Sequence, residues 1–192
     1  MVSSAKSMNS SKIRTYVKLI ESSKVYDVAQ ITPITKANQL SKALNNEVLL
    51  KREDLQPVFS FKIRGAYNKL AKLKQKGVKG PFIAASAGNH AQGVAFGAKN
   101  LGLKAFIVMP VTTPSIKVNS VKNYGGKVIL HGDNFDEAYQ YAAQLVSKEG
   151  YTFIHPFDDK DVIAGQGTVG KELIEQLDSD IDAIFVPVGG GG

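Results

Sequence analysis

The sequence predicts an α/β fold in which a parallel sheet carries helices on both faces. Between residues 81 and 156, short apolar segments alternate with segments whose hydrophobic residues keep helical spacing. Each apolar segment has hydrophobic residues in succession, which is typical of parallel strands that are covered on both sides. The chain has 192 residues, of which 43% are hydrophobic and 21% charged, so it can form a folded core.

The expected strands are short and are bounded by glycine, proline or polar residues. The segment PFIAAS at 81–86 is the first strand of the block, and three more follow at 104–110, 126–132 and 151–156. Outside the block, NEVLLKRED at 46–54 and the apolar segment at 182–188 are also expected to be strands. Strands that alternate with helices in this way predict a parallel, doubly covered sheet.

The helices between these strands have recognisable start signals. The first helix follows the sequence AGN at 87–89 and keeps its apolar residues on one face until a glycine ends it. Thr113 and Pro114 are expected to cap and open the second helix, with proline at the first helical position. Asn134 and Glu137 form a capping-box pattern for the third.

Composition and charge exclude several classes of function. The chain has no cysteine, so disulfide frameworks and zinc-thiolate sites are excluded, and no apolar run approaches the length of a membrane span. Residues 1–80 contain 16 Lys and Arg against 5 Asp and Glu. Many of these lysines gather at the end of one predicted helix, where cations suit the helix dipole, so nucleic acid is not an expected partner.

The first 14 residues are rich in serine and lysine and contain no acidic residue. They lack the length and the repeated arginines of a transit peptide, so we expect a frayed terminus and a cytoplasmic protein.

Lys62 stands out because it lies in the segment PVFSFKIRGAY at 57–67, between aromatic residues and an Arg-Gly pair. Burial would lower the pKa of its amine and make the amine nucleophilic. We expect Arg64 to help keep this amine neutral, although Arg64 could equally be a surface ion-pair residue. His90, His131 and His155 do not have the spacing of metal ligands, so no metal site is expected.

Two loops at strand ends could bind anions. The sequence SAGNHAQG at 86–93 enters a helix, and its backbone N–H groups from Ser86 to His90 could bind a carboxylate or a phosphate. Asn89 adds a donor and an acceptor there, although a plain helix cap would explain Asn89 about as well. The four glycines that follow the expected strand at 182–188 could form a second anion cradle.

A third glycine-rich segment is not expected to bind phosphate. GQGTVG at 165–170 matches a dinucleotide-binding pattern and nearly matches a P-loop. However, an acidic loop precedes it rather than a clear strand, and Glu172 replaces the hydroxyl residue that would bind magnesium. We interpret these glycines as opening a helix that packs closely on its neighbours.

A buried lysine with an Asn-containing anion loop and a glycine cradle would suit an amino acid held on pyridoxal phosphate. The segments KREDLQPVFSFKIRGAYNKL, ASAGNHAQGVAFGAK and IFVPVGGGG resemble those of a known family. They are similar to the biosynthetic threonine ammonia-lyases (threonine deaminases), members of the tryptophan-synthase-β-like, fold type II pyridoxal-phosphate enzymes. The resemblance extends from residue 25 to the end of the chain.

The resemblance implies a set of roles for individual residues. Lys62 would link covalently to pyridoxal 5'-phosphate and act as the catalytic base, Phe61 would pack near the cofactor, and Asn89 would bond the pyridine-ring hydroxyl. The substrate carboxylate would be bound by Ser86, Ala87, Gly88, Asn89 and His90. The cofactor phosphate would be cradled by Gly189, Gly190, Gly191 and Gly192.

The resemblance also implies a domain organisation and a reaction. Residues 1–80 would begin the large cofactor domain, 81–156 would form a small α/β domain that carries the Asn loop, and 157–192 would return to the large domain. The expected reaction is the deamination of L-threonine, with L-serine as a second substrate, as a step of isoleucine biosynthesis in a homotetramer. Because the chain stops where a helix should follow, we expect an N-terminal fragment that is inactive alone.

Two alternatives remain open. The first is another amino-acid enzyme with the same cofactor, a serine racemase or a catabolic serine/threonine dehydratase, because these share close versions of both motifs. The second is a non-catalytic binding or regulatory protein on the same sheet. The presence of Lys62 argues against the second, since a protein that only binds has no need for that lysine.

Overall fold

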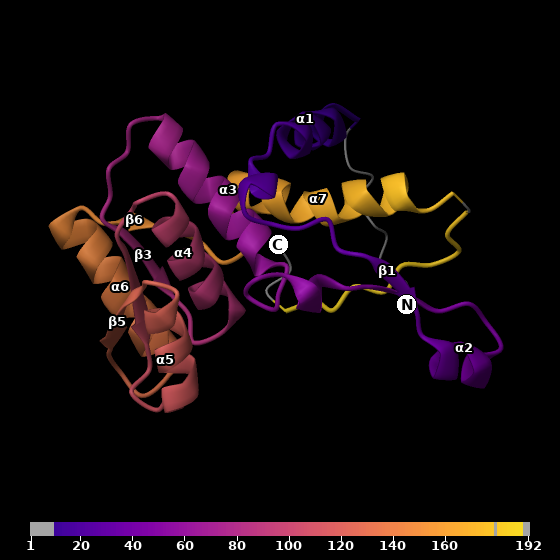
Figure 1. Cartoon of the computed structure of the whole chain (residues 1–192). Coiled ribbons are helices and arrows are strands. Elements are labelled where there is room, and N and C mark those ends of the chain that lie inside the picture. Colours follow the sequence, from indigo (N-terminus) through magenta and orange to yellow (C-terminus); the bar gives the residue numbers. More distant parts are fainter. Residues whose placement is uncertain (1–9, 179, 190–192) are drawn as a thin grey trace, which may run out of the picture.

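The computed structural model describes residues 10–178 and 180–189 of the chain (Figure 1). Residues 81–156 form one α/β unit with seven elements in strict alternation: β3 (Phe82–Ala85), α4 (Asn89–Asn100), β4 (Ala105–Met109), α5 (Ser115–Asn123), β5 (Lys127–Leu130), α6 (Phe135–Glu149) and β6 (Thr152–Phe153). The remaining elements are α1 (Ser10–Glu21), η1 (Val25–Asp27), β1 (Ile34–Lys36), α2 (Asn38–Leu44), β2 (Leu49–Lys51), η2 (Glu53–Leu55), α3 (Lys62–Gln75) and α7 (Lys160–Gln176).

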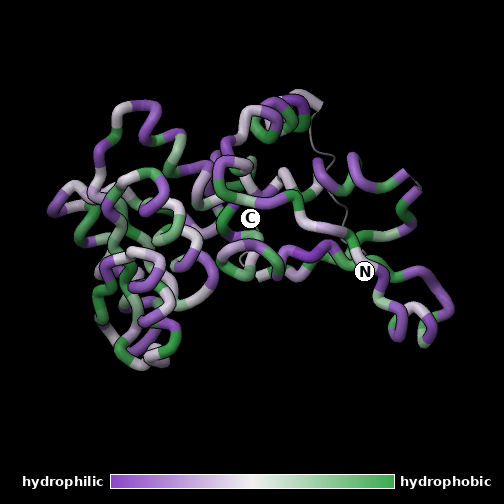
Figure 2. The backbone as a smooth tube through the Cα atoms, in the orientation of Figure 1, coloured by the Kyte–Doolittle hydropathy of each residue, from purple (hydrophilic) through white to green (hydrophobic). Residues whose placement is uncertain are grey.

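The four-stranded sheet has the order β5-β4-β3-β6, and all its described pairings are parallel. Alternate side chains of β3 enter two separate cores: Phe82 and Ala84 pack with residues of α3, α4 and α5, whereas Ile83 and Ala85 pack with α6. Figure 2 shows the apolar strands enclosed by helices of mixed polarity. The predicted sheet, with helices on both faces, is therefore confirmed.

Helix α3 links this unit to the rest of the chain, because it packs against α4 on one side and against α7 on the other (Figure 1). Two glycines allow the close approach of α3 and α7. A Cβ atom added to Gly165 would lie 2.6 Å from the Cα atom of Gly65 and 2.7 Å from the carbonyl oxygen of Arg64. The predicted close packing of the segment 165–170 is confirmed for Gly165 and Gly167 but not for Gly170, which has open space around it, and these glycines lie inside α7 rather than at its start.

The start of α7 differs from the prediction because an aspartate caps it. The side chain of Asp159 accepts hydrogen bonds from the backbone N–H groups of Asp161 and Val162, so the expected acidic loop already forms the first turn of the helix. At α6 the predicted cap is confirmed, with Asn134 Oδ1 accepting from the backbone N–H of Glu137 at 3.0 Å. At α5, Pro114 occupies the cap position and Thr113 does not cap the helix.

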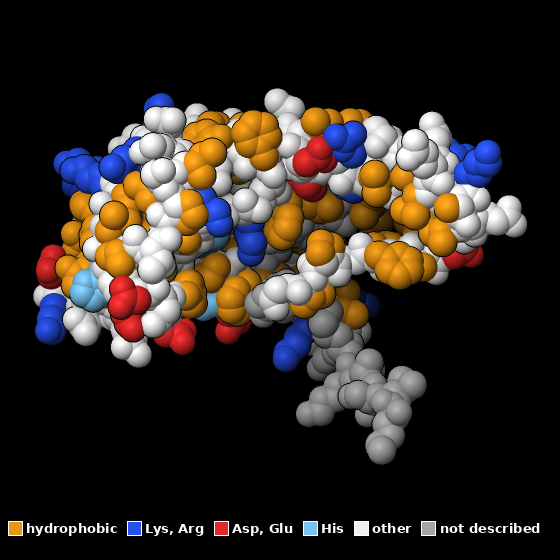
Figure 3. Space-filling view, turned by 90° about the horizontal axis from the view of Figure 1, so that it is seen from below, with side chains coloured by type: hydrophobic (Ala, Val, Ile, Leu, Met, Phe, Trp, Pro, Cys, Tyr) orange, Lys and Arg blue, Asp and Glu red, His pale blue; other side chains and the backbone are white. Residues whose placement is uncertain are grey.

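The prediction of a strand at 182–188 is wrong. Residues 182–188 form no ladder with any described residue, and the side chains of Phe185 and Val188 are 94% and 77% exposed. A strand requires a hydrogen-bonded neighbour, and this segment has none in the described part of the chain. Figure 3 views the molecule from below and shows hydrophobic side chains exposed on that face.

The expectation of a frayed start is wrong for residues 10–14, which form the first turns of α1. This helix packs against α7, and its Ile20 side chain lies where a Cβ on Gly167 would be. Within the described residues, no helix is long and apolar enough to cross a membrane.

Candidate active site

Lys62 is the first residue of α3, and its side chain is half-buried. Its Nζ atom donates a hydrogen bond to the carbonyl oxygen of Pro156 at 2.8 Å and lies 5.4 Å from the ring centroid of Phe61. Burial lowers the pKa of the Lys62 amine below its ordinary value of 10.5. No carboxylate pairs with this amine in the described part of the chain, so nothing there opposes the shift that burial makes towards the neutral, nucleophilic form.

The helix that follows the Asn loop approaches the backbone of Lys62 closely. A Cβ on Gly93 of α4 would lie 3.0 Å from the carbonyl oxygen of Lys62, so a larger residue there would require a shift of the lysine backbone. The structure therefore brings together Lys62 and the SAGNHAQG segment, which are far apart in the sequence.

The Asn loop offers fewer backbone donors than the sequence suggested. The N–H group of Ser86 belongs to the sheet and donates to Val108, and the N–H group of Gly88 donates to Ser86 Oγ. The N–H groups of Ala87, Asn89 and His90 have no acceptor among the described residues and remain available to a bound anion.

Asn89 itself is exposed, and its side chain forms no hydrogen bond with any described residue. It is the first residue of α4, whereas Gly88 occupies the cap position. The alternative that Asn89 is a plain helix cap is therefore wrong, and its amide is free to contact a ligand.

His90, the next residue, is 4% exposed, and its Nε2 atom lies 2.9 Å from the carbonyl oxygen of Ile154. Burial is the largest cause that lowers the pKa of His90, which falls to about 4. Nδ1 of His90 is buried without a hydrogen-bond partner. A neutral imidazole thus ties the start of α4 to the end of β6.

Arg64 does not lie at the surface, and the surface ion-pair alternative is wrong. Its side chain is fully buried, with the guanidinium 2.7 Å from Glu53 and 2.5 Å from Glu172. Because two carboxylates offset its charge, Arg64 does not account for the lowered pKa of Lys62, for which burial is the cause.

Of the four terminal glycines, only Gly189 lies within the described residues, where it is exposed. The prediction for Gly190, Gly191 and Gly192 falls outside the described residues. No cluster of three His, Asp or Glu residues with metal-binding geometry occurs within the described ranges.

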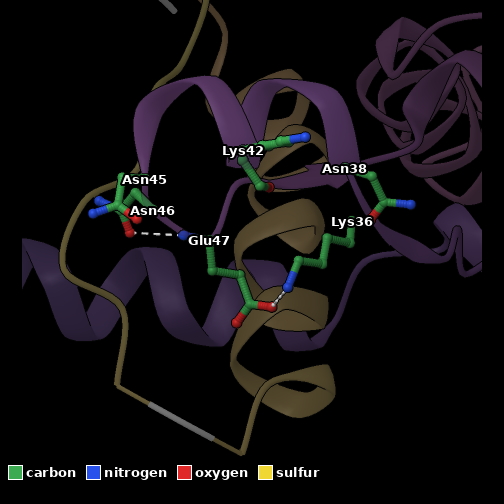
Figure 4. Close-up of a pocket in the computed structure, with 7 residues that line it drawn as sticks. Lys36, Asn38, Lys42, Asn45, Asn46 and Glu47 are labelled. Carbon is green, nitrogen blue, oxygen red and sulfur yellow. Dashed lines mark hydrogen bonds and ion pairs between the residues drawn. The ribbon is translucent and has the colours of Figure 1, made fainter.

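Two cavities lie outside this site. One, of about 480 Å³, lies beside α2 and is lined by polar side chains that include the exposed ion pair of Lys36 and Glu47, 2.8 Å apart (Figure 4). The other, of about 510 Å³, is lined by Lys79, Lys104 and Lys127 beside Phe106 and Tyr151. Neither contains Lys62 or Asn89.

Sequence reasoning missed the groups that hold Lys62 in place, because they are distant in sequence. The Pro156 carbonyl lies 94 positions from Lys62, and Glu172 was noted only as a mismatch to a P-loop. The burial of Gln56, which is 1% exposed, is likewise a feature that only the fold can show.

A model of the family described as pyridoxal-phosphate dependent enzyme matches residues 25–192, which include Lys62, the Asn loop and the terminal glycines. The chain belongs to this family. The fold expected from the resemblance, a fold type II pyridoxal-phosphate enzyme, is thereby confirmed.

Individual members of the family are similar over most of the chain. The "Threonine dehydratase 1 biosynthetic, chloroplastic" of Solanum lycopersicum is 62% identical over 177 residues, which cover 92% of this chain and 29% of that protein. The "L-threonine dehydratase biosynthetic IlvA" of Escherichia coli is 52% identical over 177 residues, with 92% and 34% covered. The chain thus spans about a third of the length of these family members.

Solved structures of family members agree. The processed form of threonine deaminase isoform 2 from Solanum lycopersicum superposes with a TM-score of 0.91 at 49% identity, covering 96% of this chain and 50% of that one. Maize serine racemase superposes with a TM-score of 0.78 at 32% identity, covering 86% and 50%.

Proposed function

We propose that the protein to which this chain belongs uses pyridoxal 5'-phosphate to convert L-threonine to 2-oxobutanoate and ammonia. The observation that carries the proposal is the Lys62 amine, whose pKa is lowered by burial and whose backbone is closely approached by Gly93 of the SAGNHAQG segment. The same segment carries backbone N–H groups that have no acceptor among the described residues. The high identity to biosynthetic threonine dehydratases supports L-threonine as the substrate.

The residues present fit this cofactor. An aldehyde reacts with the neutral form of a primary amine, and burial lowers the pKa of the Lys62 amine, whose hydrogen-bond partner is the backbone carbonyl of Pro156. The free amide of Asn89 can bond a ring hydroxyl, and the Phe61 ring next to the lysine offers an apolar contact. Pyridoxal phosphate, when bound, supplies an aldehyde for the amino group and a conjugated ring that withdraws electrons from the substrate Cα.

The side chains of this chain then have separate tasks. Lys62, whose pKa is lowered by burial, accepts the proton from the substrate Cα through its Nζ atom. The free N–H groups of Ala87, Asn89 and His90 bind the substrate carboxylate and fix its orientation. Loss of the β-hydroxyl as water, followed by addition of water and release of ammonia, balances threonine with 2-oxobutanoate and ammonia.

The remaining roles are also part of the proposal. Gly189, Gly190, Gly191 and Gly192 would hold the cofactor phosphate, and Ser86 and Gly88 would shape the carboxylate loop. In the longer protein, residues 1–80 and 157–192 would belong to a large domain and 81–156 to a small one. We propose a cytoplasmic homotetramer, with a plastid location as the alternative because a plant relative is chloroplastic.

Serine racemisation is the second candidate, because maize serine racemase shares the fold at 32% identity. The two functions are distinguished by assaying the full-length protein with L-threonine and with L-serine. Release of 2-oxobutanoate that exceeds D-serine formation supports the dehydratase. D-serine formation with little 2-oxobutanoate would overturn it in favour of the racemase.

A further inference from the structure

The segment before Lys62 is a tight turn, which we call the lysine turn and define as Gln56–Phe61. The N–H group of Phe59 donates to the carbonyl of Gln56 at 2.7 Å and closes the turn. Phe59 has a φ of 56°, a backbone conformation that costs energy for a residue with a side chain, and its ring is 73% exposed. Surrounding contacts must therefore hold this turn in place.

The strongest of these contacts comes from Gln56, which is 1% exposed. Its side-chain oxygen accepts from the N–H group of Gln30 at 3.0 Å, and its side-chain nitrogen donates to the carbonyl of Gln30 at 2.8 Å. The amide thus bonds both backbone groups of one residue, in the manner of a strand neighbour. Two bonds to one residue fix both the position and the orientation of the turn.

Two smaller contacts extend this anchor towards the lysine. Val58 is fully buried in a cluster with Val25, Ala29 and Ile63, and Ser60 accepts the backbone N–H group of Lys62 on its Oγ at 3.2 Å. The lysine turn is therefore anchored by Gln56 at its first residue and, near its other end, bonded through Ser60 to the first residue of α3.

We propose that Gln56 is a positioning residue, which holds the lysine turn so that the Lys62 amine stays half-buried at the Pro156 carbonyl. The inference rests on the proposed function, because it concerns the amine that attacks the cofactor aldehyde. Gln56 is 1% exposed, so its expected effect is through the turn and not through contact with a ligand. Its loss lets the turn relax, exposes the amine to water and raises its pKa towards the ordinary value.

Asn68 provides a matched control, because it is also a fully buried amide with two backbone contacts. Its Oδ1 accepts from the N–H group of Lys24 at 3.0 Å, and its Nδ2 donates to the carbonyl of Asp161 at 2.7 Å. Asn68 lies on α3, and neither of its hydrogen-bond partners belongs to the lysine turn. Gln56→Met and Asn68→Leu each remove one buried amide at similar volume and introduce no charge.

The test compares these variants in the full-length protein with two measurements. The first is the pH dependence of Lys62 acetylation in cofactor-free protein, read by peptide mass mapping. The second is the rate of covalent attachment of added pyridoxal phosphate to Lys62, trapped by borohydride reduction. Thermal unfolding records the loss of stability in each variant.

We expect both variants to lose similar stability, since each leaves two buried backbone groups unpaired. Only Gln56→Met should shift the Lys62 acetylation profile to higher pH and slow attachment, by about 10- to 100-fold, because a small misplacement of a reacting group carries such a cost. Equal effects of both variants on the two Lys62 readouts, or no effect of Gln56→Met, would overturn the inference. Absence of cofactor on Lys62 in the wild type would instead refute the proposed function.

If Gln56→Met does not fold, Val58→Ala loosens the same turn from its apolar side. Its control is Val108→Ala, an equal deletion at a fully buried site in the core on the α6 face of the sheet. The expected and contradicting results are the same for this pair as for the amide pair.

Discussion

The crossing of α3 and α7 yields a prediction in which two substitutions on one helix have opposite effects. Gly165 and Gly170 both lie within α7, and each can be changed to alanine. A Cβ at Gly165 would lie 2.6 Å from the Cα of Gly65, a distance that real Cβ atoms do not adopt. A Cβ at Gly170 would meet nothing within 4 Å.

The magnitudes follow from these distances. In an exposed helix interior, glycine to alanine stabilises by about 0.8–1 kcal/mol, which is the expected gain at Gly170. At Gly165 the contacted atoms are backbone, so the helices must separate, and overpacking of this kind costs about 1–3 kcal/mol beyond that gain. We expect a net loss of about 1–3 kcal/mol, which corresponds to an opening of the contact that is about 5- to 150-fold more frequent.

Hydrogen-exchange mass spectrometry of the full-length protein measures this opening in peptides from α3 and α7. Exchange should be faster in Gly165→Ala and slower in Gly170→Ala. If Gly165→Ala protected these peptides as well as Gly170→Ala does, the close crossing would not exist as described. The comparison is specific because both variants carry the same substitution on the same helix and differ only in the atoms that the added methyl group contacts.

Three further predictions concern side chains of the site and its support. Glu172→Gln breaks the buried pair with Arg64 and should lower stability by about 3 kcal/mol, whereas Glu175→Gln, which loses an exposed pair on the same helix, should change it by less than about 1 kcal/mol in urea unfolding. Asn89→Ala should leave stability within about 0.5 kcal/mol but weaken cofactor binding by about 1–3 kcal/mol in a spectroscopic titration, and unchanged binding would contradict its role. Burial lowers the pKa of His90 from 6.5 to about 4, so between pH 4 and pH 6.5 the unfolded state binds more protons than the folded state. The free energy of unfolding should therefore fall as the pH falls from 6.5 to 4, and His90→Leu should show a smaller fall.

The parallel unit was predictable because its signals are local. Its strands are apolar on both faces. The helix cap at Asn134 involves only Asn134 and Glu137, which lie three positions apart. The segment 182–188 has the same apolar composition, but a ladder depends on a neighbouring strand that composition does not specify.

The candidate site was predictable only in part, for the same physical reason. The types and spacing of Lys62 and Asn89 indicate the chemistry, because an amine and a helix start have intrinsic properties. The surroundings of Arg64 depend on Glu172, which is 108 positions away, so sequence left open whether that arginine is buried. Long-range contacts of this kind set burial and pKa, and they follow from the fold.

The central claim is that Lys62 is the residue that binds pyridoxal phosphate. The most direct measurement is borohydride reduction of the full-length protein with its cofactor, followed by peptide mass mapping. The cofactor should be found on the peptide that contains Lys62 and should be absent from Lys62→Ala. It should remain in the control variant Lys69→Ala, because Lys69 lies on the same helix but pairs with Asp159 at 2.6 Å. Cofactor on any other lysine in the wild type, or retained in Lys62→Ala, would contradict the account.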